Sequence, residues 1–384
     1  MPKGPIVRDK LLLLEKVAKG QLNGEPQPVK PRLADVLDEM DHVIRHYVRL
    51  PVAQLAIVIA LWIAGTYTFD RFRYTGYLAL RSATPRCGKT TLLRLLSQLA
   101  NGAPPITAAP TPAILFRSTR PVLLLDEVDR LRNSDKEQFG EVMLVLNFGF
   151  EQGGIVERCD RKSHEVKQFP VYGPKALAGI EGIADTLADR SFQVQMERSA
   201  QRMPRLNLRK MDELFDQLRA GLQAWSQDHG TQIAEAYDDL PDQLDCLQHF
   251  DDRFQDISEP LIVLATLADA ERPEGPQVLP RLLEGLQAAA GRREPSGREK
   301  QLLAFLDIAA TKLGQLEEVF VRSAELVTDC AVIEDLAFIE TGRKLAGFLK
   351  HFDLSPRSNG HERGYDISRE WVEKWKSRYT RPAS

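Results

Sequence analysis

The chain has 384 residues, enough for two or three domains, and its 43% hydrophobic and 27% charged residues are typical of an ordinary globular protein. Its formal net charge is −3, so any contact with nucleic acid must come from local patches and not from a global attraction. The four cysteines are isolated from one another, which argues against a zinc site and favours a reducing, cytoplasmic location.

Residues 1–50 are interpreted as an N-terminal helical segment and linker. The first 20 residues have the pattern of a short amphipathic helix and not of a secretory signal, and the Pro-rich stretch 24–32 follows them. A helical block is expected over roughly 33–65. Its apolar run, 52–65, is too short to span a bilayer and predicts a buried helix, so no membrane association is expected.

A strand expected over 76–82 leads into the stretch "ATPRCGKT" and then into a helical pattern, "TTLLRLLSQLA". This stretch matches the phosphate-binding loop except that Ala83 replaces the first glycine. Such a loop points backbone N–H groups at phosphate oxygens, and the helix N-terminus adds partial positive charge. We expect Lys89 to reach the β- and γ-phosphates and Thr90 to ligate Mg²⁺. The predicted nucleotide-binding residues are Ala83, Pro85, Arg86, Cys87, Gly88, Lys89, Thr90 and Thr91.

A loop of this kind requires a second strand that ends in an acid. The stretch "RPVLLLDEVDRL", 120–131, places four apolar residues before Asp126 and Glu127. Asp126 is expected to hold Mg²⁺, and Glu127 is expected to orient and polarise the attacking water. The sequence therefore predicts an ATPase with ATP and Mg²⁺ as cofactors.

The stretch after a helix expected over about 135–149 predicts a hairpin. "IVERC" (155–159) and "VKQFPVY" (166–172) are interpreted as its strands, joined by the basic tip "DRKSHE". "KALAGI" then predicts a buried strand, and a short helix is expected to end at Arg190 before another strand.

This order of elements resembles the AAA+ helicases of the MCM and superfamily-III type. The stretches "RCGKTTLL", "LLLDEVD", "GPKALAGI" and "DTLADRS" also resemble a bacterial family known as a domain of unknown function, from mobile-element, phage and plasmid proteins, over roughly residues 50–380. The resemblance implies an α/β fold: a P-loop AAA+ core over 51–200 with a pre-sensor-1 β-hairpin, a helical lid over 201–294 and a winged-helix domain over 295–384. It further implies Lys162 and His164 at a hairpin tip in a central DNA channel, Arg190 as an arginine finger in a neighbouring subunit's site, and a hexameric ring.

Two roles in this scheme stay open. The strand "ALAGIEG" lacks the Asn or Thr usual at the sensor-1 position, so Asn147 or a water takes that role, or hydrolysis is slow. Arg253, near the start of a lid helix, is a candidate for sensing the γ-phosphate. The functional roles of Lys162, His164 and Arg190 have structural alternatives. Lys162 and His164 would then lie in a solvated turn, and Arg190 would form an ion pair with Asp189 at the end of a helix.

The last 44 residues hold twice as many Lys and Arg as Asp and Glu. A helix is expected over 341–352, a two-stranded wing with the turn "SNG" over 353–367, and an aromatic-rich helix over 368–379. Arg343, Lys344 and Arg357 are candidates for phosphate contact in DNA. Trp371 and Trp375 are spaced for core packing. Winged helices also mediate protein contacts.

The sequence thus predicts an ATP-dependent DNA helicase or translocase of a mobile genetic element, with single-stranded DNA in a central channel and duplex DNA at the winged helix. Lys89, Asp126, Glu127 and Arg190 are the predicted catalytic residues. Two other functions stay open: a DNA-bound ATPase switch or replication initiator that does not unwind, and an AAA+ protein remodeller in phage defence. Strand displacement separates the first from a helicase, and an ATPase rate indifferent to DNA would indicate the second.

Overall fold

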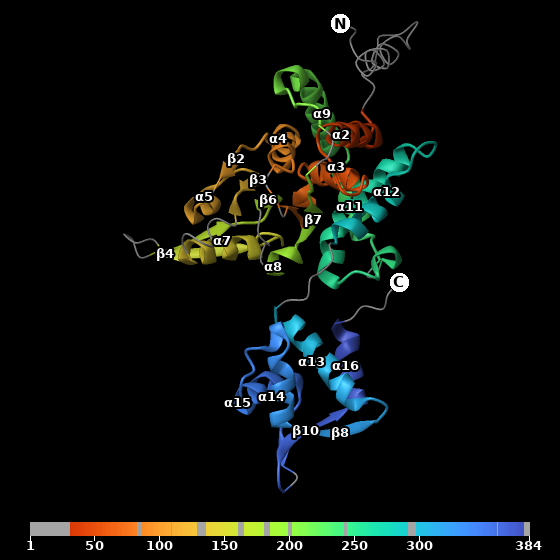
Figure 1. Cartoon of the computed structure of the whole chain (residues 1–384). Helices are drawn as coiled ribbons and strands as arrows, with labels where there is room; N and C mark the ends of the chain where they lie inside the picture. Colours follow the sequence, from red (N-terminus) through yellow and green to blue (C-terminus); the bar gives the residue numbers. More distant parts are fainter. Residues whose placement is uncertain are drawn as a thin grey trace, which may run out of the picture. The chain divides into compact units, whose positions relative to one another are not determined.

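A computed structural model describes residues 31–82, 84, 86–108, 110–128, 136–159, 165–179, 185–198, 202–241, 244–290, 297–358 and 360–379. The expected helix over 1–20 and most of both linkers lie outside these residues. The chain divides into two compact units, Met1–Gly291 and Arg292–Ser384, each of which is described by itself (Figure 1).

The larger unit is built on a five-stranded sheet, counted over the described residues, in the order β2-β3-β6-β1-β7. Its strands are β1 (Tyr77–Arg81), β2 (Ile106–Ala108), β3 (Leu123–Asp126), β6 (Lys175–Gly179) and β7 (Ser191–Gln195). Every neighbouring pair is parallel. β1 and β6 are buried along almost their whole length, as expected where helices cover both faces of a parallel sheet. The strands expected at 76–82 and 175–180 are therefore confirmed.

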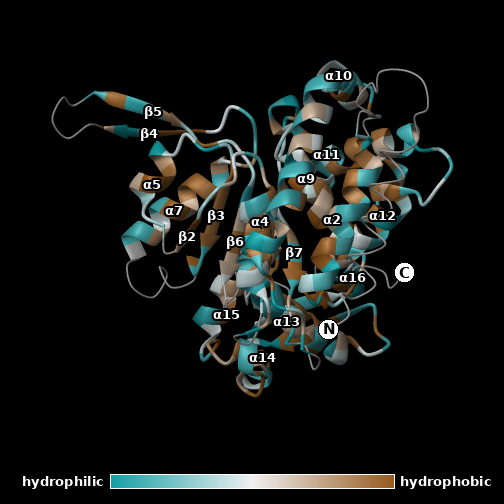
Figure 2. Cartoon of the chain, turned by 90° about the horizontal axis from the view of Figure 1, so that it is seen from above, coloured by the Kyte–Doolittle hydropathy of each residue, from teal (hydrophilic) through white to brown (hydrophobic). Residues whose placement is uncertain are grey.

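Helices cover the two faces of this sheet. α4 (Lys89–Leu99) lies on one side, and α7 (Lys136–Phe148) and the short α8 (Asp185–Ala188) lie on the other (Figure 1). α5 (Pro112–Arg117) packs against α7. The hydrophobic colour gathers on β3, β7 and α7, whereas α10 is mostly hydrophilic (Figure 2). The result is a mixed α/β fold with a parallel central sheet.

The remaining helices form one packed group. α2 (Leu33–Tyr47) and α3 (Leu55–Gly65) pack against α11 (Asp252–Glu271), and α3 also packs against α12 (Val278–Ala289). α9 (Leu208–Asp228) contacts α2 and α4, and α10 (Gly230–Asp238) contacts α11. α3 is buried from Leu55 to Ala64, so the expected buried helix is confirmed. α11 ends at Glu271 and α12 begins at Val278, and the Pro- and Gly-containing stretch 272–277 connects them.

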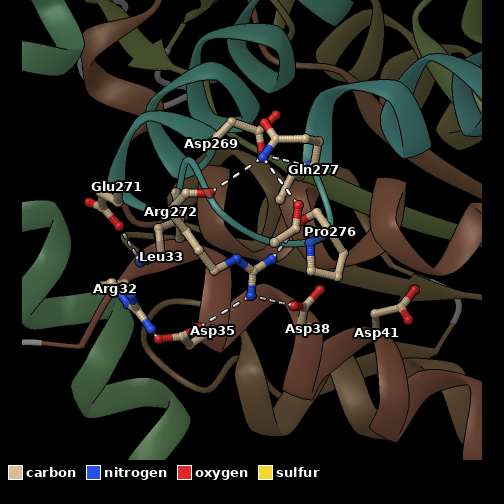
Figure 3. Close-up of polar contacts among 12 residues, drawn as sticks. Arg32, Leu33, Asp35, Asp38, Asp41, Asp269, Glu271, Arg272, Pro276 and Gln277 are labelled. Atoms are coloured by element: carbon tan, nitrogen blue, oxygen red, sulfur yellow. Dashed lines mark hydrogen bonds and ion pairs between the residues drawn. The ribbon is translucent and has the colours of Figure 1, made fainter.

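Charged side chains join α2 to the end of α11 (Figure 3). The Arg272 guanidinium lies 3.3 Å from the Asp35 carboxylate and 2.7 Å from that of Asp38. Glu271 accepts a hydrogen bond of 2.6 Å from the backbone N–H of Leu33, the first residue of α2. Asp269 accepts from the backbone N–H groups of the first turn of α12, which ties the three helices together.

A second, two-stranded antiparallel sheet is formed by β4 (Ile155–Cys159) and β5 (Val166–Pro170). The hairpin predicted over 155–172 is therefore present, and it projects away from the central sheet (Figure 2). Val156 is buried at its base, and the side-chain amide of Gln168 donates to Glu157 at 2.8 Å across the strands. The tip, with Lys162 and His164, lies outside the described residues.

Lys175 anchors the base of this hairpin from inside the protein. It is 2% exposed, and its Nζ donates to the carbonyl oxygens of Gly149 at 3.1 Å and of Val171 and Gly173 at 2.8 Å each. The Nζ also lies 5.0 Å from the ring centre of Tyr77. Burial lowers the pKa of Lys175 to about 7 from an ordinary 10.5. One side chain thus joins the end of α7, the end of the hairpin and the start of β1.

The stability of the larger unit is expected to depend on pH through Lys175. Because the pKa is lower in the folded state than in the unfolded chain, unfolding takes up a proton between the two values, and stability rises with pH across that range. We expect the unfolding free energy, relative to that of Lys175→Met, to rise by about 1 kcal/mol per pH unit from about pH 8 to about pH 9.5. Urea unfolding of both proteins across this range measures the difference. A constant difference would show that the three carbonyl acceptors keep Lys175 charged in the fold.

The smaller unit combines helices with a three-stranded sheet of order β8-β10-β9, counted over the described residues. In chain order it contains α13 (Gly297–Leu313), β8 (Glu318–Arg322), α14 (Ser323–Ala331), α15 (Gly342–Leu349), β9 (Arg357–Ser358), β10 (Arg363–Ser368) and α16 (Arg369–Tyr379). The expected hairpin at 353–367 is β9 paired antiparallel with β10. Trp371 and Trp375 lie in the core of this unit, which confirms the packing role expected for them.

Within the described residues, every helix is either too short or too polar to cross a membrane.

Candidate nucleotide-binding site

The loop between β1 and α4 has the backbone of an anion site. Gly88 precedes the first helical residue with φ 97°, a left-handed conformation that glycine adopts readily. Arg86 also has a positive φ, 65°. No side chain caps the N-terminus of α4, so its first backbone N–H groups, which an α-helix cannot satisfy itself, face the loop. Two of the predicted loop residues, Ala83 and Pro85, lie outside the described residues.

The Lys89 side chain folds back across this loop. Its Nζ donates to the Ser82 hydroxyl and lies 3.8 Å from the Cys87 sulfur. The Ser82 hydroxyl in turn donates to the carbonyl of Thr84 at 2.8 Å. Cys87 is buried, Lys89 is half-buried and Thr90 is exposed. The structure therefore brings the lysine, a hydroxyl and the amide groups of α4 to one end of β1.

Asp126 and Glu127 lie at the same edge of the sheet as the loop. β6 is the only strand between β1 and β3 in this sheet, and the pairing sets Leu125 level with Leu177 and Ala79. Asp126 is therefore level with Leu80, about 10 Å away across two strand spacings. A parallel sheet binds ligands beyond the carboxyl ends of its strands, which is where the loop and Asp126 are.

The backbone after β3 is strained. Glu127 has φ 57°, a left-handed conformation that is uncommon outside glycine, and its N–H donates to the Asp126 carboxylate at 2.9 Å. Strain of this kind is concentrated at functional sites. Both side chains are half-buried.

Arg190 lies at the opposite edge of the sheet. It immediately precedes β7, and its carbonyl accepts a hydrogen bond of 2.9 Å from the N–H of Tyr77, the first residue of β1. β1 separates Tyr77 from Arg81 by about 13 Å, and the loop lies beyond Arg81. Arg190 therefore does not share a site with Lys89 of its own chain.

Arg253 is found beside Arg190. Both guanidinium carbons face the Phe150 ring, at 4.8 Å for Arg190 and 6.0 Å for Arg253 from the ring centre. Burial, and then the positive charge of Arg253, lower the pKa of Arg190. The lid arginine named from the sequence is thus at the amino edge and away from the loop of its own chain.

Asn147 is not placed to assist at the loop. The carbonyl of the preceding residue, Leu146, accepts from the Tyr77 hydroxyl at 2.8 Å, so this turn of α7 lies at the amino edge of the sheet. A sensor-1 residue is needed at the carboxyl edge, between the loop and Asp126. This excludes Asn147 of the same chain from that role. The residues directly after β6, 180–184, lie outside the described residues.

The basic candidates of the smaller unit differ in their surroundings. Lys344 pairs with Glu340 at 2.6 Å, and Arg357 pairs with Asp366 at 2.7 Å. Arg343 is exposed on α15. The structure adds two exposed cations that sequence reasoning missed, Lys350 after α15 and Arg363 in β10. Lys350 follows Arg343 by seven residues, a spacing that keeps one helical face, and this was the available signal for Lys350. Arg363 pairs with Ser358 and so lies on the other face of the hairpin from Arg357, which means that their spacing gave no such signal.

Within the described residues, no cluster of three or more potential metal-ligating side chains is present. A magnesium ion at a phosphate site needs fewer, because Mg²⁺ is usually bound by one or two carboxylates together with waters and substrate phosphates. The Asp126 carboxylate and the Thr90 hydroxyl are ligands of the oxygen type that it prefers, and they fit this requirement.

Comparisons with known proteins give little further guidance. No family model matches the chain, and no curated protein matches it. Among solved structures, a helicase described as "SCCmec type IV Cch - active helicase" shows a TM-score of 0.45 and 11% sequence identity, over 92% of this chain and 75% of the helicase chain.

Proposed function

We propose that the chain is an ATP-dependent motor of the AAA+ class that moves along DNA. The observation that carries this proposal is the arrangement of charged groups on one sheet: Lys89, Asp126 and Glu127 at the carboxyl edge, and Arg190 at the amino edge. The carboxyl edge offers what a nucleoside triphosphate requires, namely N–H groups, a lysine and acids.

Each residue has a distinct task in this proposal. The N–H groups of the loop and the Lys89 ammonium bind the β- and γ-phosphates. Thr90 and Asp126 hold Mg²⁺, which neutralises phosphate charge when it is bound. Glu127 accepts a proton from the attacking water and orients it toward the γ-phosphate. These residues all act in the chain that binds the nucleotide.

Arg190 is assigned to the site of a neighbouring copy. Because Arg190 is too far from its own loop, it could reach a γ-phosphate only in another copy, where a guanidinium would stabilise the charge that develops. Hydrolysis would then require an assembly, for which we propose a ring, with six copies as the resemblance implies. The β4–β5 hairpin would face the channel of that ring and contact single-stranded DNA through Lys162 and His164.

The smaller unit supports a second contact with DNA. Its order of helices and strands, with a three-stranded sheet that ends in the β9–β10 hairpin, agrees with a winged-helix domain. In such a domain α15 would enter the major groove, and the hairpin would contact the backbone. Arg343, Lys350 and Arg363 present exposed charge for phosphate, whereas Lys344 and Arg357 would first have to leave their carboxylate partners.

The ATPase rate with and without single-stranded DNA tests the proposed function. We expect DNA to stimulate hydrolysis, more strongly at low salt than at moderate salt because phosphate contacts weaken as salt rises. Lys89→Ala should be inactive under both conditions. Lys162→Ala/His164→Ala should retain the basal rate and lose the stimulation.

A matched control removes the same two side-chain types elsewhere. Lys210→Ala/His249→Ala changes two exposed residues in the lid region and should keep the full stimulation. A rate that is indifferent to DNA, with the hairpin variant behaving as wild type, would contradict a DNA motor and indicate a protein client. Stimulation without strand displacement would indicate a DNA-bound switch.

A further inference from the structure

Phe150 lies where three parts of the larger unit meet. It belongs to the short connection between α7 and β4, and its carbonyl accepts a hydrogen bond of 2.8 Å from the N–H of Thr75. Two residues later, the N–H of Gln152 donates to the carbonyl of Arg73 at 2.7 Å. The connection that begins the hairpin is therefore bonded to the segment that leads into β1.

The Phe150 ring faces the arginine that we assign to the neighbouring site. The ring is 8% exposed and lies under the guanidinium groups of Arg190 and Arg253, while the Tyr74 ring stacks on it at 5.8 Å between centres. Two like charges beside one another repel, and the negative face of an aromatic ring offsets part of that repulsion, most strongly where water is excluded. The ring thus holds the Arg190 guanidinium in one direction, whereas the repulsion between Arg190 and Arg253 alone would push the two groups apart.

The same connection closes the base of the hairpin. The N–H of Gly154 donates to the carbonyl of Glu151 at 3.1 Å, and the carbonyl of Gly154 accepts from Val171 at 3.0 Å, directly after β5. Lys175 binds the carbonyl oxygens of Val171 and Gly149 on either side. A movement of the hairpin therefore acts first on the residues that carry Phe150.

We propose that Phe150 is a positioning residue that orients Arg190 according to the state of the hairpin. Nucleic acid bound to the β4–β5 hairpin would fix the connection 149–154, and with it the ring, so that Arg190 points toward the γ-phosphate of the neighbouring copy. Phe150 itself touches neither nucleotide nor DNA. The inference rests on the proposed function, because it assigns Arg190 to a second copy.

A mixture of two inactive proteins tests this role. Lys89→Ala chains keep Arg190 but lack the loop lysine, and Arg190→Ala chains keep the loop but offer no arginine. Hydrolysis in the mixture requires Arg190 of the first protein at the loop of the second. Phe150→Leu is then added to one protein or to the other, and the DNA-stimulated rate of the mixture is measured.

The effect of Phe150→Leu on the rate should depend on which of the two proteins carries it. On the Lys89→Ala chain, which supplies the arginine, it should lower the DNA-stimulated rate by about fivefold, the effect of one shielded cation–π contact. On the Arg190→Ala chain it should leave the rate unchanged. Phe150→Tyr, which keeps the ring face, should restore the rate on the supplying chain. Phe169→Leu is the matched control, since Phe169 lies in β5 of the same hairpin and its ring packs on Phe116 of α5.

Each other outcome is decisive. Equal losses at both positions would show a general structural role for Phe150 and overturn the proposal, as would no loss at either position. If the unmodified mixture hydrolyses no ATP although wild type does, the assignment of Arg190 to a second copy fails, and the inference fails with it. ATP affinity and the melting temperature of each variant identify any protein that does not fold.

Discussion

Replacing Glu127 with glutamine is expected to lower the rate of ATP hydrolysis by about 10²- to 10⁴-fold, the usual contribution of a general base. Glutamine keeps the size and the polar contacts of the side chain but cannot take a proton from water. ATP binding should persist, because the loop amides, Lys89 and Asp126 are untouched. The measurement is kcat together with the dissociation constant for ATP in the presence of Mg²⁺.

Glu137→Gln is the control for this change. It removes the same charge from an exposed position in the first turn of α7, and both constants should stay at the wild-type values. An unchanged kcat in Glu127→Gln would contradict the role of general base. A loss of ATP binding would instead show that the strained backbone at Glu127 depends on the carboxylate and shapes the phosphate site.

Gly149→Ala is expected to destabilise the larger unit by about 2–4 kcal/mol, because the added methyl group has no room. A Cβ at Gly149 would lie 2.4 Å from the carbonyl oxygen of Val171, 2.6 Å from the Lys175 Nζ and 2.9 Å from the carbonyl oxygen of Val145. Two of these neighbours are backbone atoms and the third is a buried amino group with three carbonyl partners, so none of them can move cheaply. Urea unfolding measures the loss.

Gly140→Ala offers the matched comparison within α7 itself. A Cβ at Gly140 meets no atom within 4 Å, and alanine favours the helix over glycine, so this variant should be about 0.5–1 kcal/mol more stable than wild type. Equal midpoints for Gly149→Ala and wild type would mean that the Lys175 anchor yields to a methyl group. In that case the hairpin base is less rigid than its hydrogen bonds indicate.

The closeness of the candidate nucleotide-binding residues to one another could be expected from the sequence because the motif that holds them is local. One strand, one loop and one helix place Gly88, Lys89 and Thr90 together within a few consecutive residues. Asp126 and Glu127 follow an apolar run for the same reason. Whether these residues bind ATP stays a prediction, which the ATPase assay described above tests.

The order of the strands in the sheet could not be predicted from a local motif, although this order decides which residues lie close together. β6 lies between β1 and β3, although it follows both in the chain. Asn147 was a reasonable sensor-1 candidate in the sequence, yet the direction of α7 carries it to the edge away from Asp126. Arg253 reaches Arg190 only because α11 packs near the amino ends of the strands, a contact across more than sixty residues.

The contacts of single aromatic or charged residues also could not be predicted from the sequence. Lys175 stands at the start of "KALAG" as an ordinary strand-edge lysine would. Two of its carbonyl partners, Val171 and Gly173, lie just before it in the chain, and the third, Gly149, lies 26 residues away. Phe150 is one of two phenylalanines in "NFGFEQGG". In the smaller unit, a count of basic residues did not reveal that Lys344 and Arg357 have carboxylate partners.

The carboxylates of α2 limit how the chain can be shortened for expression. A fragment that starts at residue 51 would keep every residue of the nucleotide loop. It would also lack Asp35 and Asp38, the carboxylate partners of Arg272. Arg281 would lose its contact with Asp38, which is 2.6 Å long. The apolar side of α2, which includes the fully buried Leu33, Leu37 and Met40, would leave the neighbouring helices uncovered. The shortest fragment that keeps the packing of these helices therefore begins before Leu33.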